Sequence, residues 1–239
     1  MSSNGMLERQ TVVQESDINE DLSGTKRALI EAGGELFAHH GLEGVSIRMI
    51  AEKANANVTA VNYYFGSKEN LYYEALKYAT LATDDRPVQH YLAELDGQAG
   101  PQEALAVLER LITEKTSIYL AEGEPEWHMR LVMRSLIDPT PQLRRLVDEL
   151  FRPDFEALCA LLDRCRPGMS PEEQARMAFA VMGMIFFYIT VRHPILMLLN
   201  RKAFDGEFVR QVAETICRTV TAGLDSMGRD GSRGRGESR

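Results

Sequence analysis

Apolar residues recur every three to four positions along most of the chain, which is the spacing of amphipathic helices. Alternating apolar and polar segments, which would predict strands, are scarce. Beyond residue 100 the pattern predicts helices near 102–122, 125–137, 141–164, 171–200 and 204–225. Prolines lie at or near several of their starts, where a missing N–H does no harm. The pattern therefore predicts an all-α fold.

The first quarter of the chain holds four shorter predicted helices separated by turns. The predicted caps and ends, in chain order, are Ser23 or Thr25, Gly41, Ser46, Asn57, Gly66 and Ser67. The predicted inward residues are Ala28, Leu29, Ala32, Leu36 and Phe37 in the first helix, Ile47, Ile50, Ala51 and Ala54 in the second, and Val58, Val61 and Phe65 in the third. The second and third helices, joined by a turn at 55–57 and braced by the first, describe a helix-turn-helix.

The composition narrows the possible functions. The chain has 239 residues, 44% of them apolar, which suffices for one large domain or two small ones and excludes global disorder. Its 27 Lys and Arg against 35 Asp and Glu give a net charge of −8. That charge excludes a uniformly basic coat for nucleic acid but still allows a local DNA-reading surface.

Several kinds of site are not predicted. Cys159, Cys165 and Cys217 are too few and too irregularly spaced for a disulfide framework or a zinc site, so we expect reduced thiols. The histidines show no metal-ligand spacing, and the sequence has no phosphate loop or nucleophile elbow, so we expect no metal, no cofactor and no catalytic residues. The longest apolar run, 178–191, is too short for a membrane span and no secretion signal is found, so we expect a cytoplasmic protein without a membrane partner.

The candidate site is the outward face of the helix-turn-helix. The second helix of such a motif lies in the DNA major groove and presents its first residues to base edges. Polar side chains there suit hydrogen bonds to bases, and Ala60 suits a thymine methyl group. No acidic residue lies between Lys53 and Lys68. The predicted DNA-binding residues are Ser46, Arg48, Asn57, Thr59, Ala60, Asn62, Tyr63, Tyr64 and Lys68.

Within this set the residue types suggest a division of roles. We expect Lys68 and Tyr64 to hold phosphates, and Thr59, Asn62 and Tyr63 to bear on the base sequence. A small helical bundle with tyrosines on its surface has the same pattern, so the motif alone leaves that alternative open.

Five stretches near the N-terminus carry a family resemblance: ALIEA at 28–32, LFA at 36–38, GL at 41–42, SIRMIA at 46–51 and VNYYFGSKENL at 61–71. With these stretches, residues 23–83 resemble the DNA-binding domain of the tetracycline-repressor (TetR) family of bacterial transcription regulators. Asn55 stands where the family usually has a turn glycine, and Asn62 stands where it usually has a tyrosine. Asparagine tolerates a positive φ, so we expect the turn to form.

Residues 62–68, together with Arg134, Ser135 and 138–140, are similar to the subgroup typified by the CecR regulator. The resemblance covers about residues 23–225 and implies an N-terminal three-helix helix-turn-helix DNA-binding domain joined to a larger C-terminal helical ligand-binding and dimerisation domain. We expect a flexible arm at 1–22, a DNA-binding domain at 23–83 with its helix-turn-helix at 46–65, a regulatory domain at 84–227 and a disordered tail at 228–239.

In this family the C-terminal helices form a dimer interface and a ligand cavity, so the resemblance implies both here. The predicted dimer helices are those near 171–200 and 204–225, because the first is apolar on all sides and a partner can cover one face. The predicted ligand-binding residues are Trp127, Met129, Arg130, Met133, Phe155, Met184, Phe187 and Tyr188. The implied function is a homodimeric repressor that binds a palindromic operator in double-stranded DNA and is released by a small apolar or aromatic effector.

Two other functions stay open at this point. A helical enzyme with its active site in the apolar cavity would need a clustered nucleophile or acid–base set, which the sequence does not offer. A helix-turn-helix protein that regulates through a protein partner would need no ligand and would have a filled C-terminal core.

Overall fold

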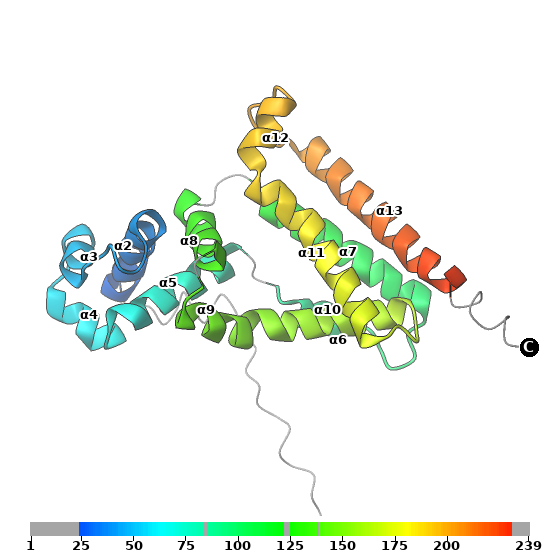
Figure 1. The fold of residues 1–239 in the computed structure, drawn as a ribbon, viewed down its shortest axis with the longest axis horizontal. Helices are drawn as coiled ribbons and strands as arrows, with labels where there is room; N and C mark the ends of the chain where they lie inside the picture. Colours follow the sequence, from blue (N-terminus) through cyan, green and yellow to red (C-terminus); the bar gives the residue numbers. More distant parts are fainter. Residues whose placement is uncertain (1–23, 84–85, 122–124, 138, 231–239) are drawn as a thin grey trace, which may run out of the picture.

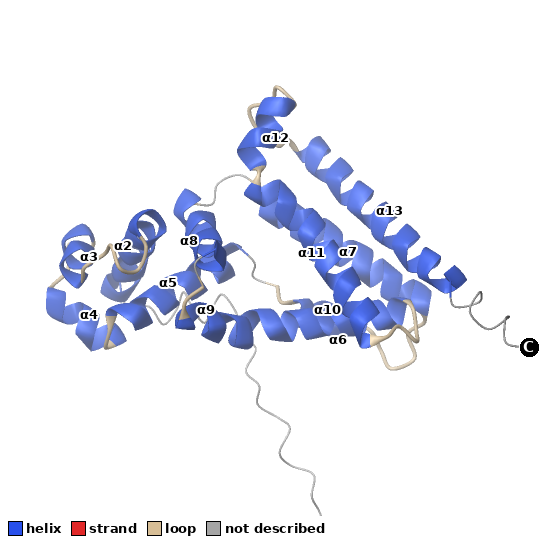
Figure 2. Cartoon of the chain, in the orientation of Figure 1, coloured by secondary structure: helices blue, strands red, loops and turns tan. Residues whose placement is uncertain are grey.

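The computed structural model describes residues 24–83, 86–121, 125–137 and 139–230, and within these ranges every regular element is a helix (Figures 1 and 2). The predicted all-α fold is confirmed. In chain order the elements are α2 (Gly24–His40), α3 (Ile47–Lys53), α4 (Val58–Phe65), α5 (Lys68–Thr83), α6 (Val88–Ala93), α7 (Pro101–Leu120), α8 (Glu126–Ile137), α9 (Pro141–Leu146), the π-helix η1 (Val147–Phe151), α10 (Arg152–Cys165), α11 (Pro171–Thr190), α12 (Arg192–Leu198) and α13 (Gly206–Asp230). Helices α2 to α5 gather at one end, α7, α10, α11 and α13 form a body at the other, and α8 stands between them (Figure 1).

Local capping fixes the first helices where the sequence predicts them. The Ser46 hydroxyl accepts a hydrogen bond from the backbone N–H of Met49 at 3.2 Å and starts α3. Gly66 ends α4 at a φ of 74°, in the left-handed region where glycine has no steric penalty, and its N–H donates to the Asn62 carbonyl at 3.0 Å. The other predicted caps and ends that the structure confirms are Gly41, Asn57 and Ser67.

One of the predicted long helices is broken next to a proline, so the prediction of a single helix over 171–200 is wrong. The 171–200 segment bends by 72° between α11 and α12, because Pro194 has no N–H for the Thr190 carbonyl and its ring would clash with that carbonyl. The predicted 141–164 segment is helical throughout and runs from α9 through the π turn η1 into α10. In this π turn the Arg152 N–H donates to the Val147 carbonyl five residues back, and Pro153, the next residue, has no N–H to donate to the Glu149 carbonyl. The short α6 lies where no helix is predicted.

The helices bury two separate apolar cores. The larger core lies in the body and is built from α6, α7, α10, α11 and α13. The second core joins α2 to α5, and it also takes in Leu131 of α8 and Leu146 of α9, both fully buried. This second core therefore includes residues beyond 83, where the sequence predicts the end of the DNA-binding domain. That domain boundary stays a prediction.

Helix α8 meets α2 at a glycine. A Cβ atom added to Gly34 would lie 2.2 Å from a ring carbon of Trp127, so the indole occupies the space that a side chain would take. The indole also stacks on Tyr78 of α5, with ring centroids 6.3 Å apart and ring planes 8° apart. The buried His128 ring meets both of these rings edge to face. One aromatic group thus seats α8 on both α2 and α5.

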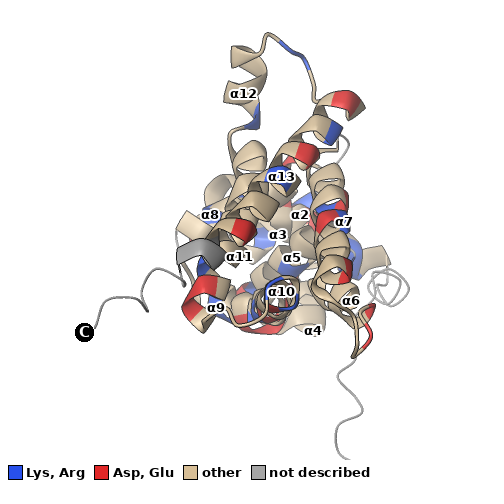
Figure 3. Ribbon diagram, turned by 90° about the vertical axis from the view of Figure 1, so that its right-hand side faces the viewer, with Lys and Arg blue, Asp and Glu red and all other residues tan. Residues whose placement is uncertain are grey.

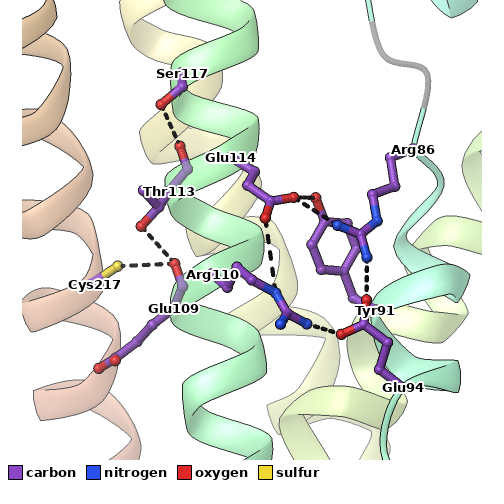
Figure 4. Close-up of polar contacts among 9 residues, drawn as sticks. All are labelled: Arg86, Tyr91, Glu94, Glu109, Arg110, Thr113, Glu114, Ser117 and Cys217. Carbon is purple, nitrogen blue, oxygen red and sulfur yellow. Dashed lines mark hydrogen bonds and ion pairs between the residues drawn. The ribbon is translucent and has the colours of Figure 1, made fainter.

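A polar network holds the segment after α5 against the body (Figure 4). Arg86 pairs with Glu94, the residue after α6, and, at 3.0 Å, with Glu114 of α7. Arg110 pairs with the same two carboxylates. The Tyr91 hydroxyl donates to Glu114, and this hydrogen bond, together with the charge of Arg86, lowers the pKa of the Glu114 carboxyl below its ordinary value. The network fixes the point at which the chain enters the body.

Further predictions concern the chain ends, the cysteines, metal ligands and membrane-spanning helices. The predicted arm at 1–22 and residues 231–239 of the predicted tail lie outside the described residues, while α13 continues through 228–230. The cysteines are free thiols, as predicted, and burial raises the pKa of Cys165 to about 12. In the described ranges no three His, Cys, Asp or Glu side chains gather as metal ligands. By length and composition no single helix there qualifies as a membrane span, and only α11 and α12 taken as a bent pair pass that test.

The contact of α8 with α2 predicts different outcomes for two neighbouring glycines. A methyl group at Gly34 must displace the Trp127 ring, so we expect Gly34→Ala to lower the free energy of unfolding by about 1–3 kcal/mol, the usual cost of an overpacked core. The matched variant Gly33→Ala meets its nearest neighbours at 3.4 Å and gains helix propensity, so it should lose no stability. Urea denaturation measures both, and equal losses would contradict the packing.

Candidate DNA-binding surface

Two asparagines build the turn between α3 and α4. Asn55 adopts a φ of 50°, in the left-handed region that asparagine tolerates better than most residues, so the predicted turn is confirmed. The side-chain oxygen of Asn57 then accepts hydrogen bonds from the backbone N–H and the hydroxyl of Thr59, each at 2.9 Å. These bonds start α4 and fix the direction in which it leaves the turn.

Helix α4 lies at the end of the molecule away from the body and buries one narrow face (Figure 1). Val61 and Phe65 enter the core, as predicted. The predicted inward position of Val58 is wrong: its side chain is 44% exposed, because the first turn of α4 extends past the core. Thr59 and Asn62 are exposed beside it, so polar groups on this face are accessible to a ligand.

The two tyrosines of α4 have different surroundings. Tyr63 is 83% exposed. Tyr64 is half-buried and, like Ala60, packs against the core of α2 to α5. The two rings meet edge to face with centroids 5.0 Å apart, so Tyr64 supports Tyr63 from behind. Of the two, Tyr63 is the more accessible to a phosphate or a base.

Two cations flank α4, and each has a partner within the chain. The Lys68 Nζ donates to the Leu42 carbonyl at 2.8 Å and ties the start of α5 to the loop after α2. Arg48 of α3 pairs with Glu52 at 2.9 Å, and both side chains are mostly exposed. An exposed pair of this kind is worth only about 0.2–1 kcal/mol, so Arg48 can exchange Glu52 for a phosphate.

A shallow groove of about 800 Å³ runs between the start of α3, the end of α4 and the start of α5. The predicted DNA-binding residues that line it are Ser46, Arg48, Asn62 and Lys68, and its acidic lining residues are Glu43 and Glu69. The other predicted residues belong to α4 or to its N-cap. The structure therefore brings the whole predicted set onto one end of the molecule.

The predicted ligand-binding residues fall into two groups that lie on different cores. Trp127, Met129, Arg130 and Met133 belong to α8, and Phe155, Met184, Phe187 and Tyr188 belong to α10 and α11. Arg130 is paired with Glu126 and contacts His39 of α2 at 2.9 Å. Phe155 stacks on Phe179, with centroids 5.0 Å apart. The structure does not bring the two groups together, and their role as ligand residues stays a prediction.

A cleft of about 740 Å³ opens between α2, α3, α5 and α8. Of the predicted ligand-binding residues, Trp127 alone lines it. The lining residues that sequence reasoning missed are Arg27, Ala28, Glu31, Ala32, Glu35, Lys53, Ala54, Tyr78, Leu81, Ala82, Pro125 and His128. The available signal was the pair Ala28 and Ala32, small residues one turn apart on α2.

An apolar strip is exposed along α11 and α12. Phe179 and Phe187 of α11 are 62% and 58% exposed, Met182 lies exposed between them, and α12 adds Met197 and Leu198. The opposite face of α11 is buried in the body core. The exposed side of α13, by contrast, carries charged side chains, among them Glu207, Arg210 and Glu214 (Figure 3). Helix α11 is thus apolar on two faces, and the described part of the chain covers one of them.

Two family models match the chain. The model for bacterial regulatory proteins of the tetR family matches residues 29–75. The model for the C-terminal domain of the HTH-type transcriptional dual regulator CecR matches residues 104–227. The CecR regulator of Shigella flexneri is 25% identical to this chain over 206 residues, which are 84% of this chain and 89% of that protein.

Solved structures share the fold. A Clostridium perfringens protein named as a fatty acid metabolism regulator matches with a TM-score of 0.62 and 18% identity, covering 82% of this chain and 97% of that one. AibR, solved with isovaleryl coenzyme A and operator DNA, matches with a TM-score of 0.56 and 16% identity, covering 82% of this chain and 96% of that one.

The cap of α4 can be tested without DNA. Asn57→Ala removes the acceptor of both Thr59 bonds, and we expect the free energy of unfolding to fall by about 1 kcal/mol, the usual worth of such a cap. Asn57→Ser keeps a capping oxygen and should retain most of the stability. If thermal and urea unfolding placed Asn57→Ser as low as Asn57→Ala, the side-chain cap would not be what starts α4.

Proposed function

Since the chain belongs to the TetR family of DNA-binding transcriptional regulators, with a CecR-type C-terminal domain, we propose that it binds a palindromic operator as a homodimer, represses transcription there, and is released by a small apolar or aromatic effector. The observation that carries the proposal is the face of α4, which presents Thr59, Asn62 and Tyr63 to solvent at the end of the molecule. No acidic side chain lies between Lys53 and Lys68 to repel a phosphate backbone.

The exposed groups suit a division between base reading and phosphate contact. In the major groove, the Asn62 amide can donate to and accept from a base edge, and the Thr59 hydroxyl can do the same more weakly. The exposed Tyr63 hydroxyl contacts either a base or a phosphate, since Tyr64 is half-buried behind it. Arg48 and Lys68, beside the groove next to α4, meet the phosphates.

The apolar strip on α11 and α12 supports a dimer. Phe179, Met182 and Phe187 form a second apolar face of α11 that a second copy of the chain can cover. The charged outer side of α13 suits the rim of such an interface rather than its centre. Two copies related by a two-fold axis present two α4 helices, which matches a palindrome with half-sites about 34–36 Å apart or a multiple of that spacing.

Release by an effector is the third part of the proposed function. AibR, which shares the fold, was solved with both an acyl coenzyme A and operator DNA. Release follows if the effector has a higher affinity for the conformation that does not fit DNA than for the conformation that does. A coupling of about 1–3 kcal/mol would lower operator affinity about 5–150-fold.

Substitutions on α4 and α5 separate the two kinds of DNA contact. We expect Asn62→Ala to cost about 1–3 kcal/mol per half-site on the operator and little on random DNA. Lys68→Ala should weaken both DNAs and flatten the slope of log affinity against log salt by about one unit per half-site. Operator selection from a random pool, followed by fluorescence anisotropy over a range of salt, measures both. If the two variants gave the same pattern, the division of roles would be wrong.

Charges placed on the apolar strip test the dimer. We expect the double variant Phe179→Glu with Phe187→Glu to sediment as a monomer at micromolar concentration while the native chain sediments as a dimer, because the charges cannot be buried in the interface. Ala106→Glu, at an exposed position on α7 outside the predicted dimer helices, serves as the control and should stay dimeric. A native chain that is monomeric both with and without operator would contradict the proposal.

A further inference from the structure

We propose that the cleft between α2, α3, α5 and α8 is a binding site for a small aromatic amine, and that its occupant shifts the helix-turn-helix relative to the body. This inference rests on the proposed regulation by an effector and names both the site and the chemical class. The cleft, of about 740 Å³, has the size of a site for a small organic molecule.

Flat and small side chains give the cleft its shape. Tyr78 and Trp127 lie parallel, with planes 8° apart, and offer aromatic surface to a guest. Ala28 and Ala32 of α2 and Ala54 at the end of α3 line the walls that these two helices form, where longer side chains would fill the space. A single aromatic ring therefore fits between small side chains and the aromatic pair.

Two carboxylates, two cations and two aromatic faces line the cleft, and the aromatic faces give it a preference for a cation over an anion. Glu31 and Glu35 lie one turn apart on α2 and both line the cleft. Each is paired within the chain, Glu31 with Arg27 at 2.9 Å and Glu35 with Lys53 at 3.0 Å. These ion pairs are near half exposed, so a bound ammonium can take the place of the Lys53 amine at little cost. The faces of tryptophan and tyrosine also attract cations and do not attract carboxylates.

The position of Lys53 couples the cleft to DNA. Lys53 is the last residue of α3, and the turn that follows leads directly into α4. Its pair with Glu35 joins the helix-turn-helix to α2 along one side of the cleft, and Trp127 seats α8 on Gly34 along another. A guest that displaces Lys53 and presses on the indole alters both contacts. The two α4 helices of a dimer would then lose the spacing that fits the operator.

The single tryptophan of the chain gives a direct readout, because it lies in the cleft. The experiment titrates the full chain, without DNA, with 2-phenylethylamine and with phenylacetate, whose rings leave tryptophan emission observable. We expect a saturable change in Trp127 fluorescence with the amine at millimolar concentration and none with the carboxylate over the same range.

Matched variants separate this site from nonspecific binding. Glu35→Gln should weaken the amine about tenfold or more, since a hydrogen bond between charged groups is lost. Glu214→Gln, which breaks an exposed ion pair on α13, should leave amine affinity unchanged. Ala28→Phe fills the cleft and should abolish the response, whereas Ala106→Phe, at an exposed position on α7, should not. Thermal unfolding shows which variants retain the native fold.

The outcomes distinguish this inference from the proposed function. Equal responses to amine and carboxylate, no response at all, or amine affinity unaffected by both Glu35→Gln and Ala28→Phe would overturn the site. Operator affinity that falls with saturating 2-phenylethylamine, together with amine affinity that falls by the same factor on adding operator, supports the coupling. Amine binding without any change in operator affinity would overturn the coupling. Failure of the ligand-free chain to select any operator would contradict the proposed function, and the titration without DNA would still decide the site.

Discussion

The packing of the Trp127 indole on Gly34 sets where the DNA-binding helices sit on the rest of the chain. Because α2 has no side chain at Gly34, α8 approaches its backbone closely and the indole fills the gap. The same ring stacks on Tyr78 of α5, so α8 cannot move on one helix without disturbing the other. Leu131 extends this contact into the core shared by α2 to α5. The helix-turn-helix is thus carried by α8 as much as by the helices next to it in sequence.

A second connection runs through the π-helical turn. Tyr73 of α5 donates to Glu149 of η1, and Arg145 pairs with Glu149 at 2.7 Å while lying over the Tyr73 ring at 3.8 Å. Burial and the bond to Glu149 raise the pKa of Tyr73 well above its ordinary value, so its hydroxyl stays a donor even in alkaline solution. Helix α10 continues from η1 into the body core, where Leu158 is buried. Helix α5 is therefore attached to both cores.

The features that sequence reasoning captured are local. Ser46, Asn57 and Gly66 act on residues within one turn of themselves, so their types alone indicate where the helices begin and end. The outward face of α4 follows from the 3.6-residue period, apart from Val58. Val58 is exposed because the core does not reach the first turn of α4, which the period alone does not reveal. The DNA-binding surface was predictable because one short motif supplies nearly all of it.

What the sequence did not reveal depends on contacts between distant segments. The break at Val191 and the π turn at η1 lie next to Pro194 and Pro153, and the apolar period of the sequence runs on through both places. The cleft brings together residues of α2, α3, α5 and α8, and no spacing along the chain places these side by side. The residues grouped as a ligand pocket by their type separate onto two cores because α8 packs toward the N-terminal helices.

Native-state hydrogen exchange at increasing denaturant tests the central claim most directly, because it shows which helices open together. If Trp127 joins α8 to the DNA-binding helices, amides of α8 should open with the same free energy and denaturant dependence as those of α2 and α5. Amides of α7 and α10 should form a separate unit. Amides of α8 that open together with α7 and α10, independently of α2, would contradict this account of how the two ends of the molecule are joined.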